Sequence, residues 1–282
     1  MSPPVFGDLG KGCRDVFGKG FHFGLMKLDV KTKTDTGVEF NTTATSNQET
    51  GKMTGQLETK YRFKEHGITV TEKWNTDNNL FATVDLQNAS MKGLKLTLDS
   101  SFSPATGSKN GKIKAEYKHD TLAAQADMDM NMGGPLVNAS LVLGHQGWLA
   151  GYQMAFDSTK SKITRNNIGL GYAKGDFVFH SNVNDGQVFS GSVYQRVNPA
   201  LETGVQLGWT SSNNATQFGI GCKYNLDRDA SIRAKINNNS QLGLGYQQRL
   251  REGITITLST LIDGKNFNQG GHKLGVALEV SA

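Results

Sequence analysis

The alternation of apolar and polar residues with a period of two is the feature that most restricts how this chain folds. Near the end of the chain, Ile254, Ile256 and Leu258 point to one face, while Thr255 and Thr257 point to the other. This period is that of a β-strand with one apolar and one solvated face. Nearly every segment back to about residue 25 repeats the pattern. The sequence therefore predicts an all-β protein.

The predicted strands follow one another closely, with short turns rich in Gly, Asn, Asp and Ser between them. Such short connections make neighbouring strands antiparallel. The predicted ranges are 26–34, 38–46, 53–63, 68–75, 80–86, 94–102, 113–117, 122–130, 137–143, 148–156, 168–172, 177–183, 189–197, 201–209, 218–224, 232–236, 242–250, 254–262 and 273–280. A membrane-spanning strand of about ten residues with a turn of about three or four predicts roughly nineteen strands.

The composition allows three folds for so long a β pattern. With 37% hydrophobic residues and no long apolar run, the chain has the hydropathy of a soluble protein, for which one or two large β-sandwiches or a repeat array are the alternatives to a closed sheet. A closed barrel with lipid outside and water inside has the same modest average, because only alternate residues are apolar. Closure also removes the free edges of the sheet. We predict a transmembrane β-barrel over residues 25–282, preceded by a separate segment, residues 1–24.

The N-terminal segment has the one helical pattern. Phe6, Leu9, Cys13 and Val16 recur at helical spacing with charged residues between them. Its several glycines each weaken a helix by about 1 kcal/mol relative to Ala, so the helix needs support from packing. Two placements remain open: an amphipathic lead-in bound to the surface, or a plug or gate that rests on the barrel wall.

Charged residues lie on the polar face of the predicted strands, and basic groups outnumber acidic ones there. A water-filled lumen lined in this way is expected to favour anions through its summed field. A solvated sheet face also bears mixed charges, but that interpretation does not explain how both ends of so long a sheet are protected. The basic residues on this face are Lys27, Lys31, Lys33, Lys60, Arg62, Lys73, Lys95, Lys112, Lys114, Lys118, Arg196, Lys223, Arg233, Lys235 and Lys273.

Glu72 interrupts the apolar face of its strand. It shares that face with Ile68, Val70 and Trp74. A carboxylate that faces lipid is energetically expensive, which makes it a candidate functional residue. The alternative is a bulge or register shift that turns Glu72 inward.

No pattern in the sequence predicts catalysis, a metal site or a cofactor. The six histidines lack metal-ligand spacing, and no nucleophile or phosphate-loop motif is present. Two distant cysteines predict no disulfide framework. The net charge of +5, without a basic run that contains aromatic residues, does not predict nucleic-acid binding. The amino terminus has no apolar core of a secretory signal, so we expect targeting information within the barrel.

Several stretches resemble the mitochondrial voltage-dependent anion channels, the eukaryotic outer-membrane porins, and the similarity covers essentially the whole chain. Barrels of this family are known with nineteen strands, so the strand estimate agrees with a known case. The matching stretches are Asp8-Leu-Gly-Lys, Arg14-Asp-Val-Phe17, Leu57-Glu-Thr-Lys-Tyr61, Thr71-Glu-Lys-Trp-Asn-Thr-Asp77, Gly147-Trp-Leu-Ala-Gly-Tyr-Gln153, Asn182-Val-Asn-Asp-Gly186, Asp263-Gly-Lys-Asn266, Gly270-Gly-His-Lys-Leu-Gly275 and the signature from Tyr224 to Gly245.

The resemblance implies a voltage-gated, anion-preferring channel that passes ATP, ADP, phosphate and small metabolites across the mitochondrial outer membrane. It implies a first and a last strand that pair in parallel, and a helix inside the pore. It further implies binding of hexokinase and Bcl-2 family proteins, a role in apoptosis, self-association and contact with mitochondrial membrane lipids.

Residue roles also follow from the resemblance. Nucleotide or anion contacts are expected at Lys11, Arg14, Lys19, Lys95, Lys112, Lys114 and Lys235. Glu72 is expected to be the membrane-facing carboxylate for hexokinase docking and oligomer contacts. Gly20 and Gly24 are expected to form the hinge, where His22 replaces the usual middle glycine. The sorting signal is expected at Lys273, Gly275, Leu278 and Val280.

Two further functions remain as alternatives to a metabolite channel. One is a membrane-anchored docking platform that uses Glu72 and the N-terminal helix. The other is a protein-import pore, for which a cation-preferring lumen is expected.

Overall fold

The computed structural model describes residues 2–88, 91–130, 134–265, 267–268 and 270–282. Within these residues the chain forms a 3₁₀ turn, one α-helix and nineteen strands. The elements are η1 (Phe6–Asp8), α1 (Lys11–Gly18), β1 (Leu25–Lys33), β2 (Glu39–Asn47), β3 (Met53–Phe63), β4 (Ile68–Asn75), β5 (Leu80–Gln87), β6 (Leu94–Ser103), β7 (Ser108–Lys118), β8 (Leu122–Met130), β9 (Leu136–His145), β10 (Trp148–Asp157), β11 (Lys162–Lys174), β12 (Phe177–Asn184), β13 (Val188–Arg196), β14 (Leu201–Thr210), β15 (Ala215–Asn225), β16 (Ala230–Asn237), β17 (Gln241–Arg251), β18 (Ile254–Asp263) and β19 (Lys273–Ser281).

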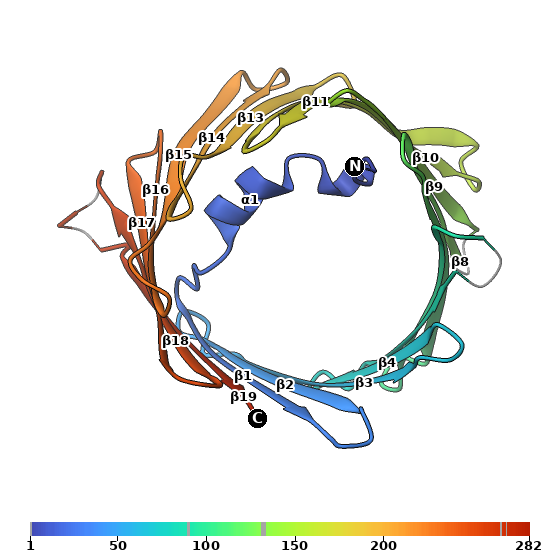
Figure 1. Ribbon diagram of the computed structural model, residues 1–282, viewed down its shortest axis with the longest axis horizontal. Helices are drawn as coiled ribbons and strands as arrows, with labels where there is room; N and C mark the ends of the chain where they lie inside the picture. The colour runs from blue at the N-terminus through green and yellow to red at the C-terminus, as the bar shows by residue number, and fades with distance from the viewer. Residues whose placement is uncertain (1, 89–90, 131–133, 266, 269) are drawn as a thin grey trace.

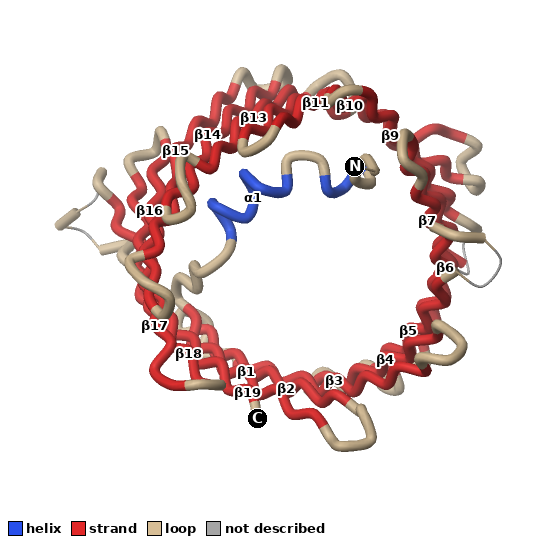
Figure 2. The backbone as a smooth tube through the Cα atoms, in the orientation of Figure 1, coloured by secondary structure: helices blue, strands red, loops and turns tan. Residues whose placement is uncertain are grey.

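The strands close into one barrel (Figures 1 and 2). Each strand pairs in antiparallel fashion with the next along the chain, as the short turns require. The ring closes where β1 pairs in parallel with β19, with Met26 opposite Val276 and Val30 opposite Val280. The predicted barrel and its parallel closure are confirmed, and a β-sandwich is excluded.

The two faces of the barrel wall are chemically distinct. Cross-strand partners share a face, so the register extends each assignment around the ring. Trp74 and Leu274 face outward and are 55% and 67% exposed, whereas the lysines and carboxylates predicted for the polar face point into the lumen. Among the described residues, no helix is both long and apolar enough to cross a membrane.

The strand boundaries agree closely with the prediction except at three short segments. The structure extends the predicted ranges 113–117, 168–172 and 218–224 to the full lengths of β7, β11 and β15. The added residues are largely polar and lack alternation, but their backbone groups still pair with neighbouring strands. A register shift next to Ala155 and Phe156 adds irregularity to the β10–β11 pair.

The N-terminal helix is interrupted, and it lies inside the barrel. The expected pattern from Phe6 to Phe17 divides at Gly10, whose φ of +70° is left-handed. A Cβ atom at Gly10 would lie 2.8 Å from Nδ1 of His180 on β12, so the backbone approaches the wall where only glycine fits. Figure 1 shows α1 inside the ring, beside β13 to β16. Of the two placements left open, the structure has the one against the barrel wall.

Candidate functional site

The lumen and the segment that lies in it form the candidate functional site. The start of the segment packs into the main buried apolar cluster of the described residues, where Val5 and Leu9 contact Ala123 on β8 and Val142 on β9. Farther along, the Cys13 thiol donates a hydrogen bond of 3.5 Å to the carbonyl oxygen of Val205 on β14. Burial raises the pKa of this thiol. The segment is therefore held against the wall on both sides of Gly10.

Glycines on the lumen face let the segment approach the wall closely. A Cβ atom at Gly151 would lie 2.8 Å from the ring of Phe6, and one at Gly221 would lie 3.2 Å from Cγ1 of Val16. At Gly275 on β19, an added Cβ atom would collide with the carbonyl oxygen of His22. These contacts run from β10 to β19, so the segment follows about half of the ring (Figure 2).

The three predicted cations of the N-terminal segment all have partners within that segment. Lys11 pairs with Asp8 at 3.3 Å, and Lys19 pairs with Asp15 at 2.7 Å. Arg14 donates to the carbonyl oxygens of Gly7 and Leu9 and so ties α1 to the turn before it. The ion-paired Lys11 and Lys19 side chains remain 58% and 65% exposed to the lumen.

Three of the predicted wall cations lie on β6 and β7 and are bound to carboxylates. Lys95 pairs with Asp85 at 3.1 Å, and Lys114 pairs with Glu116 at 3.7 Å. Lys112 lies between two carboxylates, 2.8 Å from Asp127 and 3.3 Å from Asp129. The structure does not bring these lysines together with the helix, because α1 contacts β13, β14 and β15.

Lys235 on β16 has a different environment from the other predicted cations. Its ammonium group donates a 2.7 Å hydrogen bond to the carbonyl oxygen of Phe17 in the last turn of α1. It also lies over the rings of Phe21 and Phe23, at 4.1 and 5.0 Å from their centroids. A cation at this position satisfies a terminal helix carbonyl and complements the helix dipole. Lys235 thus anchors the end of α1 to the wall.

Three lumen cations outside the predicted nucleotide contacts also form no ion pair. Lys31 on β1, and Lys60 and Arg62 on β3, form no ion pair with any described carboxylate. Register identifies only part of this group: Lys31 lies opposite Asn41 and Ser281, and Arg62 lies opposite Thr69. Lys60 lies opposite Glu39, but the Glu39 carboxylate pairs with Lys33 at 3.4 Å. Lys112, in contrast, lies between Asp99 and Asp129.

The two predicted hinge glycines have the backbone that glycine favours. Gly20 and Gly24 have φ values of +75° and +71°. Between them, the His22 N–H donates to the hydroxyl oxygen of Ser259 at 2.9 Å. Burial lowers the pKa of the His22 imidazole, and the nearby Lys27 lowers it further. The hinge is therefore attached to the wall at its middle residue.

The predicted sorting residues lie on β19, the strand that closes the barrel. Lys273 pairs with Glu49 at 2.7 Å, and Gly275 lies beneath His22. Leu278 and Val280 lie opposite Leu28 and Val30 on β1.

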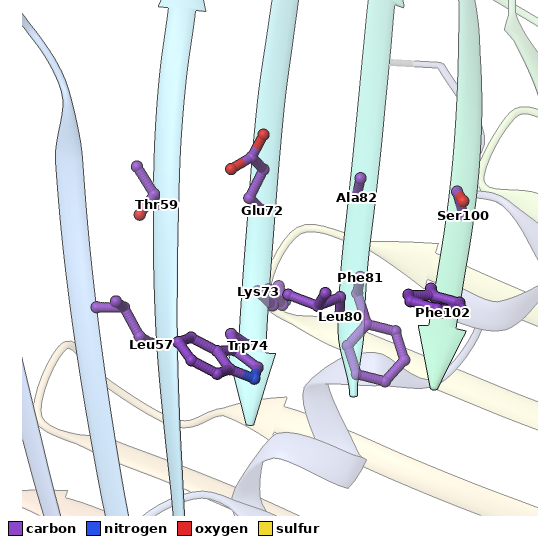
Figure 3. Close-up of a pocket in the computed structure, with 10 residues that line it drawn as sticks. All are labelled: Leu57, Thr59, Glu72, Lys73, Trp74, Leu80, Phe81, Ala82, Ser100 and Phe102. Atoms are coloured by element: carbon purple, nitrogen blue, oxygen red, sulfur yellow. The ribbon is translucent and has the colours of Figure 1, made fainter. Parts of the chain in front are cut away.

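Glu72 lies on the outer face of β4. Register is unbroken through this strand, so the alternative of a bulge does not hold. Glu72 lies between Thr59 and Ala82, and Ser100 continues this row; the parallel row of Leu57, Trp74, Leu80 and Phe102 is apolar (Figure 3). Together these residues line an open groove of about 420 Å³.

Within the described ranges, no three His, Cys, Asp or Glu side chains are grouped so as to hold a metal ion. Chemically, the lumen is a water-filled passage with charged walls, and its geometry serves binding and passage of ions.

Comparisons with known proteins agree with this geometry. The family model described as eukaryotic porin matches residues 2–275. A Drosophila melanogaster protein named voltage-dependent anion-selective channel is 60% identical over 282 residues, which cover all of both chains. Proteins named non-selective voltage-gated ion channel VDAC2 are 57% identical over 280 residues: the Xenopus laevis protein covers 99% of both chains, and the Homo sapiens protein covers 99% of this chain and 95% of its own.

A solved structure supports the fold alone. A mutant of Rhodopseudomonas blastica porin superposes with a TM-score of 0.52 at 9% identity, over 78% of this chain and 95% of that one. Together with the match of the family model over nearly the whole chain and the full-length identities, the closed barrel leads to one conclusion: this chain belongs to the eukaryotic porins, a family of voltage-gated membrane channels and not of enzymes.

Proposed function

We propose that this protein is an anion-preferring, voltage-gated channel of the mitochondrial outer membrane that passes ATP, ADP, phosphate and small metabolites. The observation that supports anion preference most directly is the unpaired group Lys31, Lys60 and Arg62, together with the exposed ammonium groups of Lys11 and Lys19. The names of the relatives differ on this point, since one is anion-selective and the others are non-selective. The basic lumen favours the first property for this chain.

Passage requires no covalent chemistry. Ammonium and guanidinium groups in a narrow aqueous passage raise the local concentration of anions. Conduction also requires that each contact be weak enough to release the permeant, and a sequence of several sites meets this requirement. Partial neutralisation of Lys95, Lys112 and Lys114 by carboxylates suits transient binding of phosphate groups.

The test is the reversal potential of the refolded protein in a planar bilayer under a KCl gradient. We expect chloride preference in the open state and a stepwise fall in conductance at high voltage of either sign. A cation preference would contradict the proposal and favour an import pore. Fractionation of cells that express a tagged chain tests the location, and recovery outside the mitochondrial outer membrane would contradict that part.

Glu72 supports a second proposed role, as a docking surface. Its carboxylate lies on the outer face between Thr59 and Ala82, in a groove that Trp74 and Phe102 also line, and it forms no ion pair with the described residues. We propose that this face takes part in self-association and in docking of hexokinase and Bcl-2 family proteins, as the family resemblance implies.

This role is separable from conduction. Glu72→Gln is expected to abolish hexokinase retention on protein-containing vesicles, because it removes the charge and keeps the shape. Glu65→Gln, in the turn between β3 and β4, is the matched control and should retain binding. Both variants should conduct normally. Equal hexokinase retention by wild type and Glu72→Gln would exclude this carboxylate as a docking determinant.

A further inference from the structure

Phe81 interrupts the alternation of β5. Leu80 and Ala82 face outward, and Phe81 points between them into the lumen. Its register partners are Lys73, whose ammonium group pairs with the lumen carboxylate of Glu58 at 2.9 Å, and Ser101. A large apolar ring therefore lies on a face that otherwise meets water.

One other strand aromatic of the described residues, Tyr194 on β13, lies on the lumen face. The N-terminal segment covers Tyr194: a Cβ atom at Gly12 would lie 3.1 Å from its ring. The Tyr194 hydroxyl also donates to Glu202 at 3.1 Å. Phe81 is 40% exposed, on the side of the barrel that α1 does not reach (Figure 1). No described part of the N-terminal segment covers the exposed face of this ring, so a ligand in the lumen can reach it and bury its apolar surface.

The ring borders a shallow recess of about 290 Å³ in the lumen wall. Polar groups surround the ring on β5 to β8: Thr83, Asp99, Ser101, Asn110, Lys112 and Asp129. The Thr83 hydroxyl donates to Oδ1 of Asp99 at 2.6 Å, which fixes that carboxylate. Its other oxygen forms no hydrogen bond with the described residues. A flat apolar surface with acceptors and an amide at its edge suits a planar heterocycle with amino groups.

We propose that Phe81 is a stacking platform for the base of a purine nucleotide, with Asp99 and Asn110 at the edge of the ring system. The proposal rests on the proposed passage of ATP and ADP and adds a base-recognising contact to it. Aromatic side chains stack on bases without regard to sequence, because every base has a π face, and a carboxylate accepts hydrogen bonds from exocyclic amines.

The charges of the recess favour the base over the phosphates. Asp99 and Asp129 oppose the single Lys112, which is already bound by Asp127 and Asp129. In this recess a polyphosphate without a base meets only the partly neutralised Lys112, which Phe81→Leu leaves unchanged. The phosphates of a bound nucleotide are left to the basic groups elsewhere in the lumen.

Comparing ATP with inorganic tripolyphosphate separates the contribution of the base to binding from that of the phosphates. In planar bilayers, we expect Phe81→Leu to weaken the apparent affinity for ATP, measured from the decrease in single-channel current, by about fivefold, the low end of the range for one base–aromatic contact. Tripolyphosphate should act equally on wild type and variant. Phe81→Tyr should behave like wild type, and Phe102→Leu, an aromatic deletion on the outer face, is the matched control.

The outcomes separate the two proposals. If ATP does not enter the wild-type channel, the proposed metabolite passage fails, and this inference fails with it. If ATP enters and its apparent affinity is the same in wild type and Phe81→Leu, only the stacking platform is overturned. An equal loss for ATP and tripolyphosphate would also overturn it, because the base would then have no part.

A binding measurement on Phe81→Trp keeps the inference testable if Phe81→Leu does not fold. The neutral nucleoside adenosine should quench the fluorescence that the introduced indole adds to that of the three native tryptophans. An added Asp99→Asn substitution should weaken this quenching. Quenching by tetramethylammonium and not by adenosine would assign the recess to organic cations and overturn the proposal.

Discussion

At the scale of single residues, ion pairing divides the lumen cations into two groups. Lys95, Lys112 and Lys114 form ion pairs with carboxylates, Lys114 within its own strand. Lys31, Lys60 and Arg62 form no ion pair with the described residues. Both groups contribute equally to net charge, but a phosphate that binds a paired lysine must compete with its carboxylate.

Two triple substitutions to Gln test this division. Each removes three positive charges, so both should move the reversal potential toward cation preference to a similar degree. Only substitution at positions 31, 60 and 62 should markedly shorten the residence of ATP, because it removes the free cations. Bilayer recordings measure both quantities. Equal loss of ATP residence in the two variants would mean that ion pairing does not limit phosphate binding.

At the scale of elements, the N-terminal segment is docked along its whole length. Apolar contacts of Val5, Leu9 and Val16, the Lys235 contact at the end of α1 and the His22 hydrogen bond together hold it. Each fully buried apolar side chain contributes about 1.5–3 kcal/mol to this docking. Complete undocking of α1 is therefore costly, and we expect voltage-driven closure to proceed with the helix in place.

A disulfide tests this expectation. A Cβ atom at Gly204 would lie 3.2 Å from Sγ of Cys13, within reach of a disulfide. Gly204→Cys, in a Cys222→Ser background, should form a disulfide between the introduced thiol and Cys13 on oxidation. We expect conductance and voltage-driven closure to persist in the oxidised protein. Closure that is lost on oxidation and returns on reduction would show that α1 must leave the wall.

The hinge residue His22 makes the free energy of unfolding dependent on pH. Burial holds the pKa of His22 below its usual value of about 6.5, and Lys27 acts in the same direction, while Glu279 and Asp29 oppose it. The docked hinge thus favours the neutral form of the His22 imidazole. Its contribution to stability is present above pH 6.5 and is lost as pH falls through the lowered pKa.

We therefore expect the thermal midpoint of the detergent-refolded wild type to fall more between pH 7.5 and 5.5 than that of His22→Gln. The variant keeps the main-chain hydrogen bond to Ser259 but has no titrating ring. Other groups titrate in both proteins, so the difference reports on His22. If the thermal midpoints of wild type and His22→Gln fall by the same amount across this pH range, docking of the hinge does not alter the pKa of the His22 imidazole.

At the scale of the whole molecule, the barrel closes without the N-terminal segment. Every strand pairing, including the parallel β1–β19 contact, involves residues after Gly24. A chain that lacks residues 1–20 should therefore refold with native β content by circular dichroism. Its midpoint in urea should be lower, because the contacts of Leu9, Cys13 and Val16 with the wall are gone. Failure to form β structure would mean that the barrel needs the N-terminal segment in order to fold and close.

Much of this architecture follows from local sequence. Period-2 alternation and short turns predict antiparallel strands one by one, because each depends only on neighbouring residues. The outward position of Glu72 follows in the same way from the residues beside it. The strand ends at 108–112 and 162–167 and the break at Gly10 did not follow, because backbone pairing and contact with His180 decide them.

The sequence by itself determined the strands, their two faces and the basic character of the lumen, since side-chain direction in a strand alternates whatever the partners are. Tertiary structure alone decided which cations are free, where α1 lies and which aromatic ring meets water. These properties depend on pairs such as Lys31 with Ser281 and Val16 with Gly221, which are far apart in the chain. Closure of the ring brings such pairs together, and no local pattern records them.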